Sequence, residues 1–382
     1  MNIIRDHIKF LYIKVCRYLL HFLYFLPIKK NRVFFESFSG ANYNCNPKYI
    51  SEYLHKKYKD TFEIIWAFKD TNINVPQYIV KCKYRSLTHI YYRLTSKFYI
   101  SNFLQADEIP KRKGQIYIQT WHGGGCYKKV GKEEKLRNSI YSKRQKIQLN
   151  ETDFFLTSSK YWEAEVLRKQ FEYKGQALSI GMPRNDLLVS NSKKLRKLIR
   201  QKLGINENQY FILYAPTWRE NNDVFEPLDV SNLKKYLATK HGKDVIVGFR
   251  SHVYGKEKNI DMVDFSNYPD MQELLLACDS LITDYSSSMW DFSILKKPCY
   301  LFVPDLKRYL DQRGFDRDIY SWGFDVCKTN EELFNAINSY NEKKIITLME
   351  KHQNDLISFE KGNASELVVK LIYDESCMRS LS

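Results

Sequence analysis

Short runs of β-branched and aromatic residues alternate with stretches of helical character along most of this chain, and this alternation most constrains its fold. In the first half, strands are predicted at residues 32–35, 62–68, 98–101, 116–119 and 154–157, with a helix at 47–57. A second set of strands is predicted at residues 210–215, 244–249, 280–283 and 299–303. Strands separated by helical segments indicate βαβ units and parallel sheets, so we expect an α/β protein.

Two successive sets of strands predict two doubly wound, Rossmann-like domains, and 382 residues suit two domains of medium size. The predicted divisions are an amphipathic helix at residues 1–30, a first domain at 31–189, a connector helix at 190–208 with Gly204 at its end, a second domain at 209–344 and terminal helices at 345–382. Ligands of such domains bind at the carboxyl ends of the strands, and we expect them in an interdomain cleft.

Residues 8–26 are nearly apolar enough to span a bilayer, but basic side chains interrupt them. At 100° per residue, His7, Lys14, Arg17 and His21 fall within one narrow arc of a helix. This pattern predicts an amphipathic helix with a basic stripe that lies in the headgroup plane of a membrane. Packing on the protein's own core is the alternative. A transmembrane span is disfavoured because each charge at bilayer depth costs about 2.5 kcal/mol or more.

The charge of the chain predicts an anionic partner, because 60 Lys and Arg against 44 Asp and Glu leave a net charge of +16. Anionic lipid, a phosphorylated substrate and nucleic acid all satisfy this, but the sequence has no recognisable nucleic-acid module, so we expect no nucleic-acid partner. The basic run at residues 128–146 suits either a solvated helix face or a contact with an anionic membrane surface. The eight cysteines are scattered singly, as in a reducing compartment.

The sequence Gln-Thr-Trp-His-Gly-Gly-Gly at residues 119–125 follows an apolar strand and contains the first candidate catalytic residue, His122. A histidine at the carboxyl end of a strand, followed by glycines, is exposed to a group that approaches the glycine backbone. Imidazole can take a proton near neutral pH, so His122 is a candidate general base. The alternative is a histidine that only stabilises a turn.

Three motifs of the second half also follow predicted strands: Arg219 ends a Pro-Thr-Trp-Arg segment, His252 follows Arg-Ser, and Ser286 and Ser287 begin a helix that continues to residue 295. Arginine forks onto phosphate, and free backbone N–H groups at a helix start bind it. Each motif alone is explained equally well by an ordinary surface side chain or a capped helix that binds no ligand. Together they predict a pyrophosphate site without a metal. The Asp-Arg-Asp sequence at 316–318 lacks a preceding strand and is disfavoured as a metal-ligand pair.

These motifs resemble those of the CDP-glycerol glycerophosphotransferase family of teichoic acid and capsule polymer synthesis. The matching segments are residues 39–43, 46–50, 119–123, 181–186, 215–219, 281–287, 291–292, 313–315 and 362–366. The resemblance runs from about residue 35 to 369. It implies a GT-B fold, a final helix that returns to the first domain, attachment to the cytoplasmic face of the plasma membrane, and CMP as the leaving group.

The resemblance also implies roles for individual residues. His122 is then the base, and Arg219, His252, Ser286 and Ser287 contact the donor phosphates. The residues Thr217, Asp284 and Asp291 are expected to contact the donor ribose or glycerol or to support its loops, and Gly40, Asn42, Gly123 and Gly124 are expected on the acceptor side. The chain departs from the family pattern at Gly124-Gly125 and at Ser251 and Val253, beside two of these expected residues.

The resulting hypothesis is an enzyme, without metal or other cofactor, that transfers glycerol phosphate from CDP-glycerol to a lipid-linked saccharide or polyol-phosphate chain. A donor such as CDP-ribitol or another CDP-polyol is one alternative. A GT-B glycosyltransferase that uses a nucleotide sugar is a second, because it shares the fold and the phosphate site.

Overall fold

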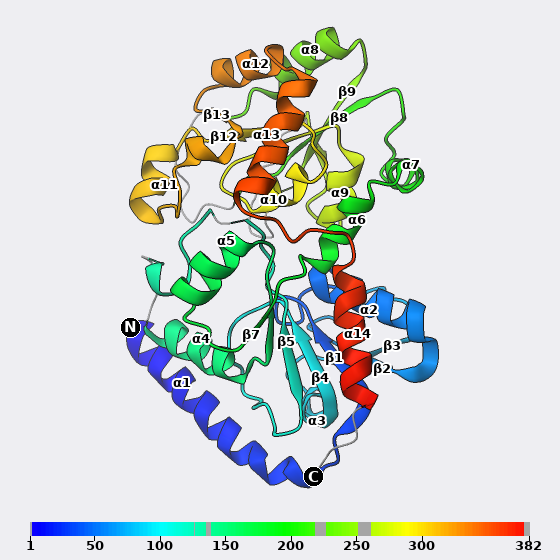
Figure 1. Ribbon diagram of the computed structural model, residues 1–382, viewed down its shortest axis with the longest axis vertical. Coiled ribbons are helices and arrows are strands. Elements are labelled where there is room, and N and C mark those ends of the chain that lie inside the picture. Colours follow the sequence, from blue (N-terminus) through cyan, green and yellow to red (C-terminus); the bar gives the residue numbers. More distant parts are fainter. Residues whose placement is uncertain (1, 126, 135–138, 218–226, 251–260, 378–382) are drawn as a thin grey trace.

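A computed structural model describes residues 2–125, 127–134, 139–217, 227–250 and 261–377. Within these ranges the chain forms two α/β units, each built on one parallel sheet, which stack along the long axis of the molecule (Figure 1). We call the part built on the N-terminal sheet the first unit and the other the second unit.

The first sheet has the strand order β3-β2-β1-β4-β5-β6-β7 in the described residues, and every neighbouring pair is parallel. Its strands are β1 (Lys29–Glu36), β2 (Glu63–Phe68), β3 (Ile79–Lys83), β4 (Ser96–Ser101), β5 (Ile116–Gln119), β6 (Phe154–Leu156) and β7 (Gln176–Leu178). Val33, Phe34 and Phe35 of β1 are fully buried, because helices cover both faces of the sheet.

The second sheet repeats this arrangement with the described order β10-β9-β8-β11-β12-β13, again parallel throughout. Its strands are β8 (Tyr210–Tyr214), β9 (Val245–Phe249), β10 (Val263–Asp264), β11 (Ser280–Thr283), β12 (Cys299–Phe302) and β13 (Asp325–Cys327). In both sheets the first strand lies next to the fourth, which is the doubly wound order with a switch point at that pair. The predicted α/β class is therefore confirmed.

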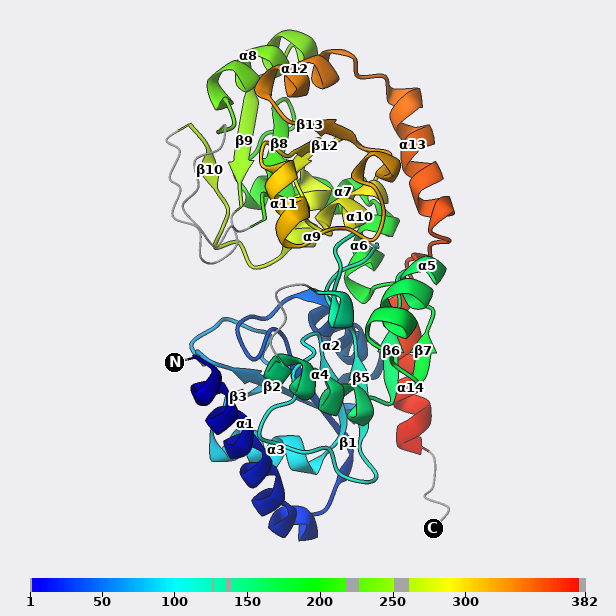
Figure 2. The same cartoon turned by 90° about the vertical axis from the view of Figure 1, so that its left-hand side faces the viewer.

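Most helices lie in the connections between strands, whereas α1 and η1 precede the first strand and α12, α13 and α14 follow the last (Figures 1 and 2). They are α1 (Asn2–Leu19), α2 (Cys45–Tyr58), α3 (Leu87–Thr95), α4 (Ser139–Glu151), α5 (Lys160–Trp162) with the π-helical η4 (Glu163–Gln170), α6 (Asp186–Ser190), α7 (Lys193–Lys202), α8 (Val230–His241), α9 (Met271–Ala277), α10 (Ser288–Ser293), α11 (Leu306–Gln312), α12 (Asn330–Asn338), α13 (Glu342–Asp355) and α14 (Ala364–Cys377). The short helices η1 (Leu20–Phe25), η2 (Lys59–Thr61), η3 (Gly131–Glu133), η5 (Pro183–Asn185) and η6 (Ile319–Trp322) complete them.

Apart from the loop that follows β5, the described chain passes from one unit to the other at two places. After η5, the helices α6 and α7 pack on α9, so the predicted connector helix belongs to the second unit. It ends as expected, with Gly204 at a φ of +71° just past α7. Of the two terminal helices only α14 returns: Val368, Val369 and Ile372 join the first core, whereas α13 packs on α10 in the second unit.

The N-terminal helix lies along the outside of the first unit beside α4 (Figure 1). Arg17, assigned from the sequence to an exposed basic stripe, is half-buried instead. It donates to the backbone O of Asp107 and Ile109 at 3.1 and 3.2 Å and pairs with Glu151 of α4. The prediction that Arg17 is exposed is wrong, because its guanidinium binds residues of the first unit and holds the helix against them.

The outward side of α1 and η1 carries apolar as well as basic side chains, since His7, Lys14 and His21 of the predicted stripe are exposed. Large apolar side chains stand exposed along it: Ile8, Leu11, Tyr12, Val15, Tyr18, Leu19, Phe22 and Phe25. Ile13, in contrast, is fully buried against the first unit. The helix thus packs on the protein with one face, as the alternative interpretation expected, and leaves the other uncovered. Among the described residues no helix is both long and apolar enough to cross a membrane.

Candidate active site

His122 lies in the loop that follows β5, at the carboxyl edge of the first sheet. Its Nδ1 is 2.8 Å from the backbone O of Asn102, which follows β4. Because a carbonyl only accepts hydrogen bonds, Nδ1 carries the proton, and Nε2 of the neutral ring is the nitrogen that can take up another. The ring also packs against Trp121 and Phe38, with centroid distances of 4.4 and 5.2 Å. The imidazole is therefore held in an orientation and tautomer that suit a base.

The residue before the candidate base has a strained backbone. Trp121 has a φ of +53°, in the left-handed region that is unfavourable for a bulky side chain. Its N–H donates to Oε1 of Gln119 at 2.9 Å, and its carbonyl accepts from Nδ2 of Asn46 at 3.0 Å. Strain of this kind persists where surrounding contacts over-determine it, as at many functional sites.

The glycines after His122 allow the first unit to touch the second. A Cβ atom on Gly123 would lie 3.1 Å from Oγ of Ser287, and one on Gly124 would lie 2.0 Å from Cδ1 of Trp290. Real Cβ atoms do not approach that closely, so only glycine fits at Gly124 without a shift of Trp290. The loop of the candidate base therefore lies directly against the start of α10.

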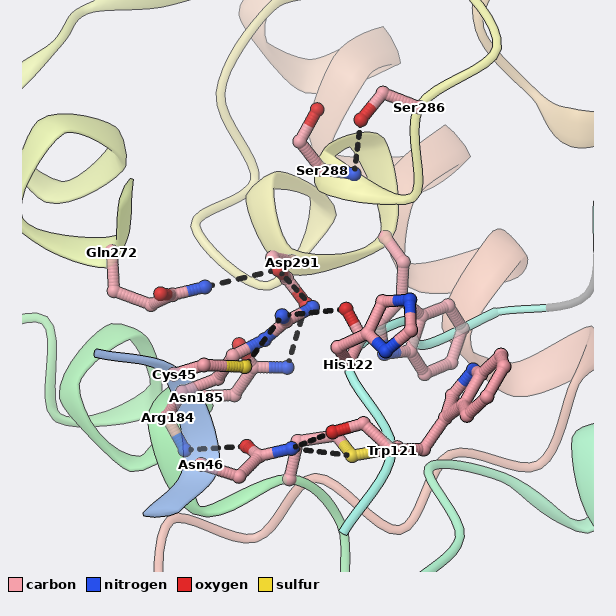
Figure 3. A network of polar contacts seen from close by, with 12 residues as sticks. Cys45, Asn46, Trp121, His122, Arg184, Asn185, Gln272, Ser286, Ser288 and Asp291 are labelled. Carbon is pink, nitrogen blue, oxygen red and sulfur yellow. Dashed lines mark hydrogen bonds and ion pairs between the residues drawn. The ribbon is translucent and has the colours of Figure 1, made fainter. Parts of the chain in front are cut away.

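Ser286 and Ser287 form the turn between β11 and α10, and Oγ of Ser286 accepts from the backbone N of Ser288 at 3.3 Å (Figure 3). The helix ends at Ser293, two residues earlier than predicted. Since Ser287 lies against Gly123, the hydroxyls expected to contact the donor phosphates and the loop of the expected base meet at one place. Each lies at the carboxyl end of a strand in its own sheet.

Thr217 and Asp284 connect the ends of β8 and β11. The backbone N and Oγ1 of Thr217 both donate to the carboxylate of Asp284, at 2.8 and 2.5 Å. Asp284 also accepts from the N–H of Tyr285. These contacts fix the two loops on either side of the switch point, which is the supporting role that was one of the two expectations for Thr217 and Asp284.

Gly40 and Asn42 follow β1, at the same edge of the first sheet as His122. Gly40 has a φ of +74°, and its carbonyl accepts from the backbone N of Lys69 at 2.7 Å. Asn42 is half-buried in the same loop. The contacts of Gly40 lie with Lys69 and Tyr84, at the ends of β2 and β3. A contact with an acceptor stays a prediction for both residues.

Asp291, expected to contact the donor or to support its loops, lies in a buried interdomain network (Figure 3). Its carboxylate lies 2.7 Å from Nη2 of Arg184 and accepts from Asn185 at 2.9 Å and Gln272 at 3.1 Å. Burial acts to lower the pKa of Arg184, but Asp291 and Cys45 raise it above its ordinary value. Because these partners occupy Asp291, the geometry favours the supporting role over a contact with ribose or glycerol.

Glu360, in the segment that returns to the first unit, completes this network. It accepts from Asn185, from Nε1 of Trp290 and from the backbone N of Met182, each at 3.0 Å. Burial raises the pKa of Glu360 to about 7. No individual role is predicted from the sequence for Arg184, Asn185 or Glu360. The segment at 181–186 was singled out only by its resemblance, and no local pattern marks Glu360.

Two predicted donor contacts, Arg219 and His252, lie outside the described residues. In the part that is described, no group of three or more His, Cys, Asp or Glu side chains could hold a metal ion. Asp316 of the disfavoured Asp-Arg-Asp sequence instead accepts from Nε2 of Gln170 at 2.7 Å.

Comparison with known proteins decides the family. Residues 18–374 match the family described as CDP-Glycerol:Poly(glycerophosphate) glycerophosphotransferase. The chain belongs to this family. The predicted family and enzyme class, a transferase that uses CDP-glycerol, are therefore confirmed.

Individual members of the glycerophosphotransferase family show how far the likeness extends. The chain is 31% identical over 375 residues to a teichoic acid poly(glycerol phosphate) polymerase of Bacillus spizizenii, covering 90% of this chain and 92% of that protein. It is 32% identical to a protein of that description from Staphylococcus epidermidis, covering 91% of this chain but only 51% of the longer relative.

The solved structure of the wall teichoic acid polymerase TagF superposes with a TM-score of 0.83 at 29% identity, covering 98% of both chains. A TagF variant soaked with CDPG gives 0.82 at 28% identity, again covering 98% of both. The expected GT-B-type arrangement of two Rossmann-like units is thus confirmed.

Proposed function

We propose that this protein transfers glycerol phosphate from CDP-glycerol to a hydroxyl of a membrane-linked saccharide or a growing polyol-phosphate chain in teichoic acid or capsule polymer synthesis, and releases CMP. The contact between Gly123 and Ser287 carries the proposal. It brings the loop of His122 and the Ser286–Ser287 turn together at the carboxyl edges of both sheets, where doubly wound proteins bind ligands.

In the proposed reaction Nε2 of His122 removes the proton from the acceptor hydroxyl, whose oxygen attacks the glycerol-bearing phosphorus. The bond from this phosphorus to the bridging oxygen breaks, and CMP leaves with that oxygen. Catalysis of phosphoryl transfer rests mainly on positioning and on stabilisation of charge. The bond from His122 to Asn102 supports this role, because it orients the ring before the acceptor arrives.

For the donor, we propose that Ser286 and Ser287 contact the phosphates together with Arg219 and His252, without a metal. Thr217 and Asp284 hold the adjoining loops. The likeness to TagF, which was also studied after soaking with CDPG, supports a CDP-glycerol donor. A related CDP-polyol such as CDP-ribitol is the second candidate.

For the acceptor, we propose attachment of the protein to the cytoplasmic face of the plasma membrane through α1 and η1. The exposed row that includes Leu11, Tyr18 and Phe22 supports this, because contiguous apolar surface with basic neighbours binds an anionic lipid interface. A lipid-linked acceptor would then be presented to the first unit.

A donor panel tests the proposal. Nucleotide release is measured with membranes that carry a lipid-linked acceptor: CMP from CDP-glycerol and from CDP-ribitol, and the nucleoside diphosphate from a nucleoside-diphosphate sugar. Acceptor-dependent release of CMP from CDP-glycerol alone is expected. Turnover of CDP-ribitol alone would show that CDP-ribitol is the donor. Transfer of the sugar alone would show that the protein is a glycosyltransferase and contradict the proposed reaction.

A further inference from the structure

The loop that carries His122 continues into the core of the other unit. Tyr127 is almost completely buried and belongs to the hydrophobic core of the second unit, with its ring centroid 4.7 Å from that of Trp322. A connection between two strands of the first sheet therefore contributes a core residue to the second unit. Such a side chain resists withdrawal, because its removal from the core would expose a buried aromatic ring to water.

The phenol of Tyr127 has a specific partner on α13. Its oxygen lies 2.7 Å from Nε2 of His352, and both residues are buried. Burial lowers the pKa of His352 to about 3, so this imidazole is neutral at physiological pH and can accept the hydrogen bond at Nε2. The contact ties the loop to the helix that leads into the second chain crossing.

Backbone contacts add to the attachment of Tyr127 to the second unit, and we call these contacts together with the buried ring the anchor. The carbonyl of Tyr127 accepts from the N–H of Asp316 at 2.9 Å, and Lys128 forms an antiparallel bridge with the residue before Asp316. The chain then returns to the first unit, where the N–H of Val130 donates to Oε1 of Gln170 at 2.8 Å. Nε2 of Gln170 donates to Asp316 in turn, so the loop is held from both units.

The glycines between His122 and Tyr127 are tightly packed. Gly124 is pressed against Trp290, and a Cβ atom on Gly125, whose φ is +67°, would lie 2.5 Å from the ring of Tyr127. A displacement of Tyr127 therefore displaces the glycines that follow His122.

We propose that Tyr127 is a positioning residue for the transfer reaction: anchored in the second unit, it holds the loop of His122 at a fixed separation from the Ser286–Ser287 turn. The inference rests on the proposed function, in which His122 is the base and the two serines contact the donor. A misplacement of about 1 Å between reacting groups can cost about 100-fold in rate, so the anchor sets kcat. It does not set donor affinity, because the proposed donor contacts lie in the second unit.

The test compares Tyr127→Phe with Tyr300→Phe, a buried tyrosine on β12 that packs in a different core cluster of the second unit. Three quantities are measured on folded protein: kcat for CMP release, the Kd of CDP-glycerol, and hydrogen exchange of the amides at residues 122–125. For Tyr127→Phe we expect kcat to fall about three- to tenfold, as for loss of one buried hydrogen bond, with unchanged Kd and faster exchange. Tyr300→Phe is expected to change none of the three, and Tyr127→Ala to lower kcat further.

Exchange and kcat that match wild type in Tyr127→Phe would overturn the inference, as would an equal loss of kcat in Tyr300→Phe. Failure of the proposed function looks different. Wild type would then release no CMP from CDP-glycerol, and the anchor would be judged by exchange and by kcat with whichever donor of the panel is turned over.

Discussion

Arg184 donates from Nη1 to the backbone O of His122 at 2.7 Å, while its Nη2 lies 2.7 Å from Asp291. One buried guanidinium thus touches the proposed base in the first unit and the helix after the proposed donor turn in the second. The relative placement of the two halves of the site is therefore a property of the fold before any substrate binds.

Replacement of Arg184 by Met is expected to destabilise the protein by about 3–5 kcal/mol, because it leaves the carboxylate of Asp291 buried without its cation. Denaturant unfolding followed by fluorescence measures this loss. Lys351→Ala serves as the control, since it breaks only an exposed pair with Asp355 and should cost less than about 1 kcal/mol. Equal effects of the two substitutions would contradict the structural role of Arg184.

Glu360 is expected to make stability depend on pH. Its pKa of about 7 in the folded protein exceeds the ordinary value of about 4.3, so the native state holds the proton more tightly than the unfolded chain. The contribution of this proton to the free energy of unfolding is therefore complete below about pH 4. It is lost as the pH rises to 7, and the free energy of unfolding then falls by up to about 1.4 kcal/mol per pH unit. Unfolding free energies between pH 5 and 8 should show this decline in wild type and a flatter profile in Glu360→Gln. Identical profiles would argue against it.

Gly124→Ala should lower turnover strongly, because its Cβ would overlap the ring of Trp290. The matched substitution is Gly204→Ala, which also replaces a glycine but meets no atom within 4 Å of the new Cβ. Its positive φ should cost about 1 kcal/mol of stability and leave kcat unchanged. Steady-state CMP release and thermal unfolding of both variants separate the loss of turnover from the loss of stability. A wild-type kcat in Gly124→Ala would contradict the need for glycine at this position.

Binding to anionic vesicles tests the role of the N-terminal helix. The double variant Tyr18→Asp with Phe22→Asp changes two side chains that are 78% and 81% exposed, so the fold should tolerate it. Loss of two apolar side chains from the interface should weaken co-sedimentation with phosphatidylglycerol vesicles at least about tenfold. Leu198→Asp, on α7 of the second unit, is the control and should bind as wild type does. Equal binding by all three proteins would rule out this face as the membrane contact.

Much of the fold could be predicted from sequence because the central strands are buried on both faces and form plain apolar runs. The predicted strands at 116–119 and 280–283 coincide with β5 and β11. The strands that were not predicted, β3, β7, β10 and β13, are the edges of the two sheets. Edge strands are short and covered on fewer sides, so they carry little hydrophobic signal.

The site was predictable only in part. His122 and Ser287 follow strands, so the carboxyl-edge rule was enough to place each of them. Arg184, Glu360 and Tyr127 act through contacts between the units, and the spacing of a sequence does not encode which buried groups meet across two domains. The predicted basic stripe of α1 was wrong at Arg17 for a similar reason, since its partner Glu151 is distant in sequence.

His122 is the proposed base for a donor held by the second unit, and His122→Ala tests this role. CMP release at saturating CDP-glycerol and the Kd of CDP-glycerol are measured on the variant and on wild type. We expect turnover to fall at least about 100-fold with an unchanged Kd, because a positioned base contributes about 10²–10⁴ in rate. Turnover within a few-fold of wild type would contradict it.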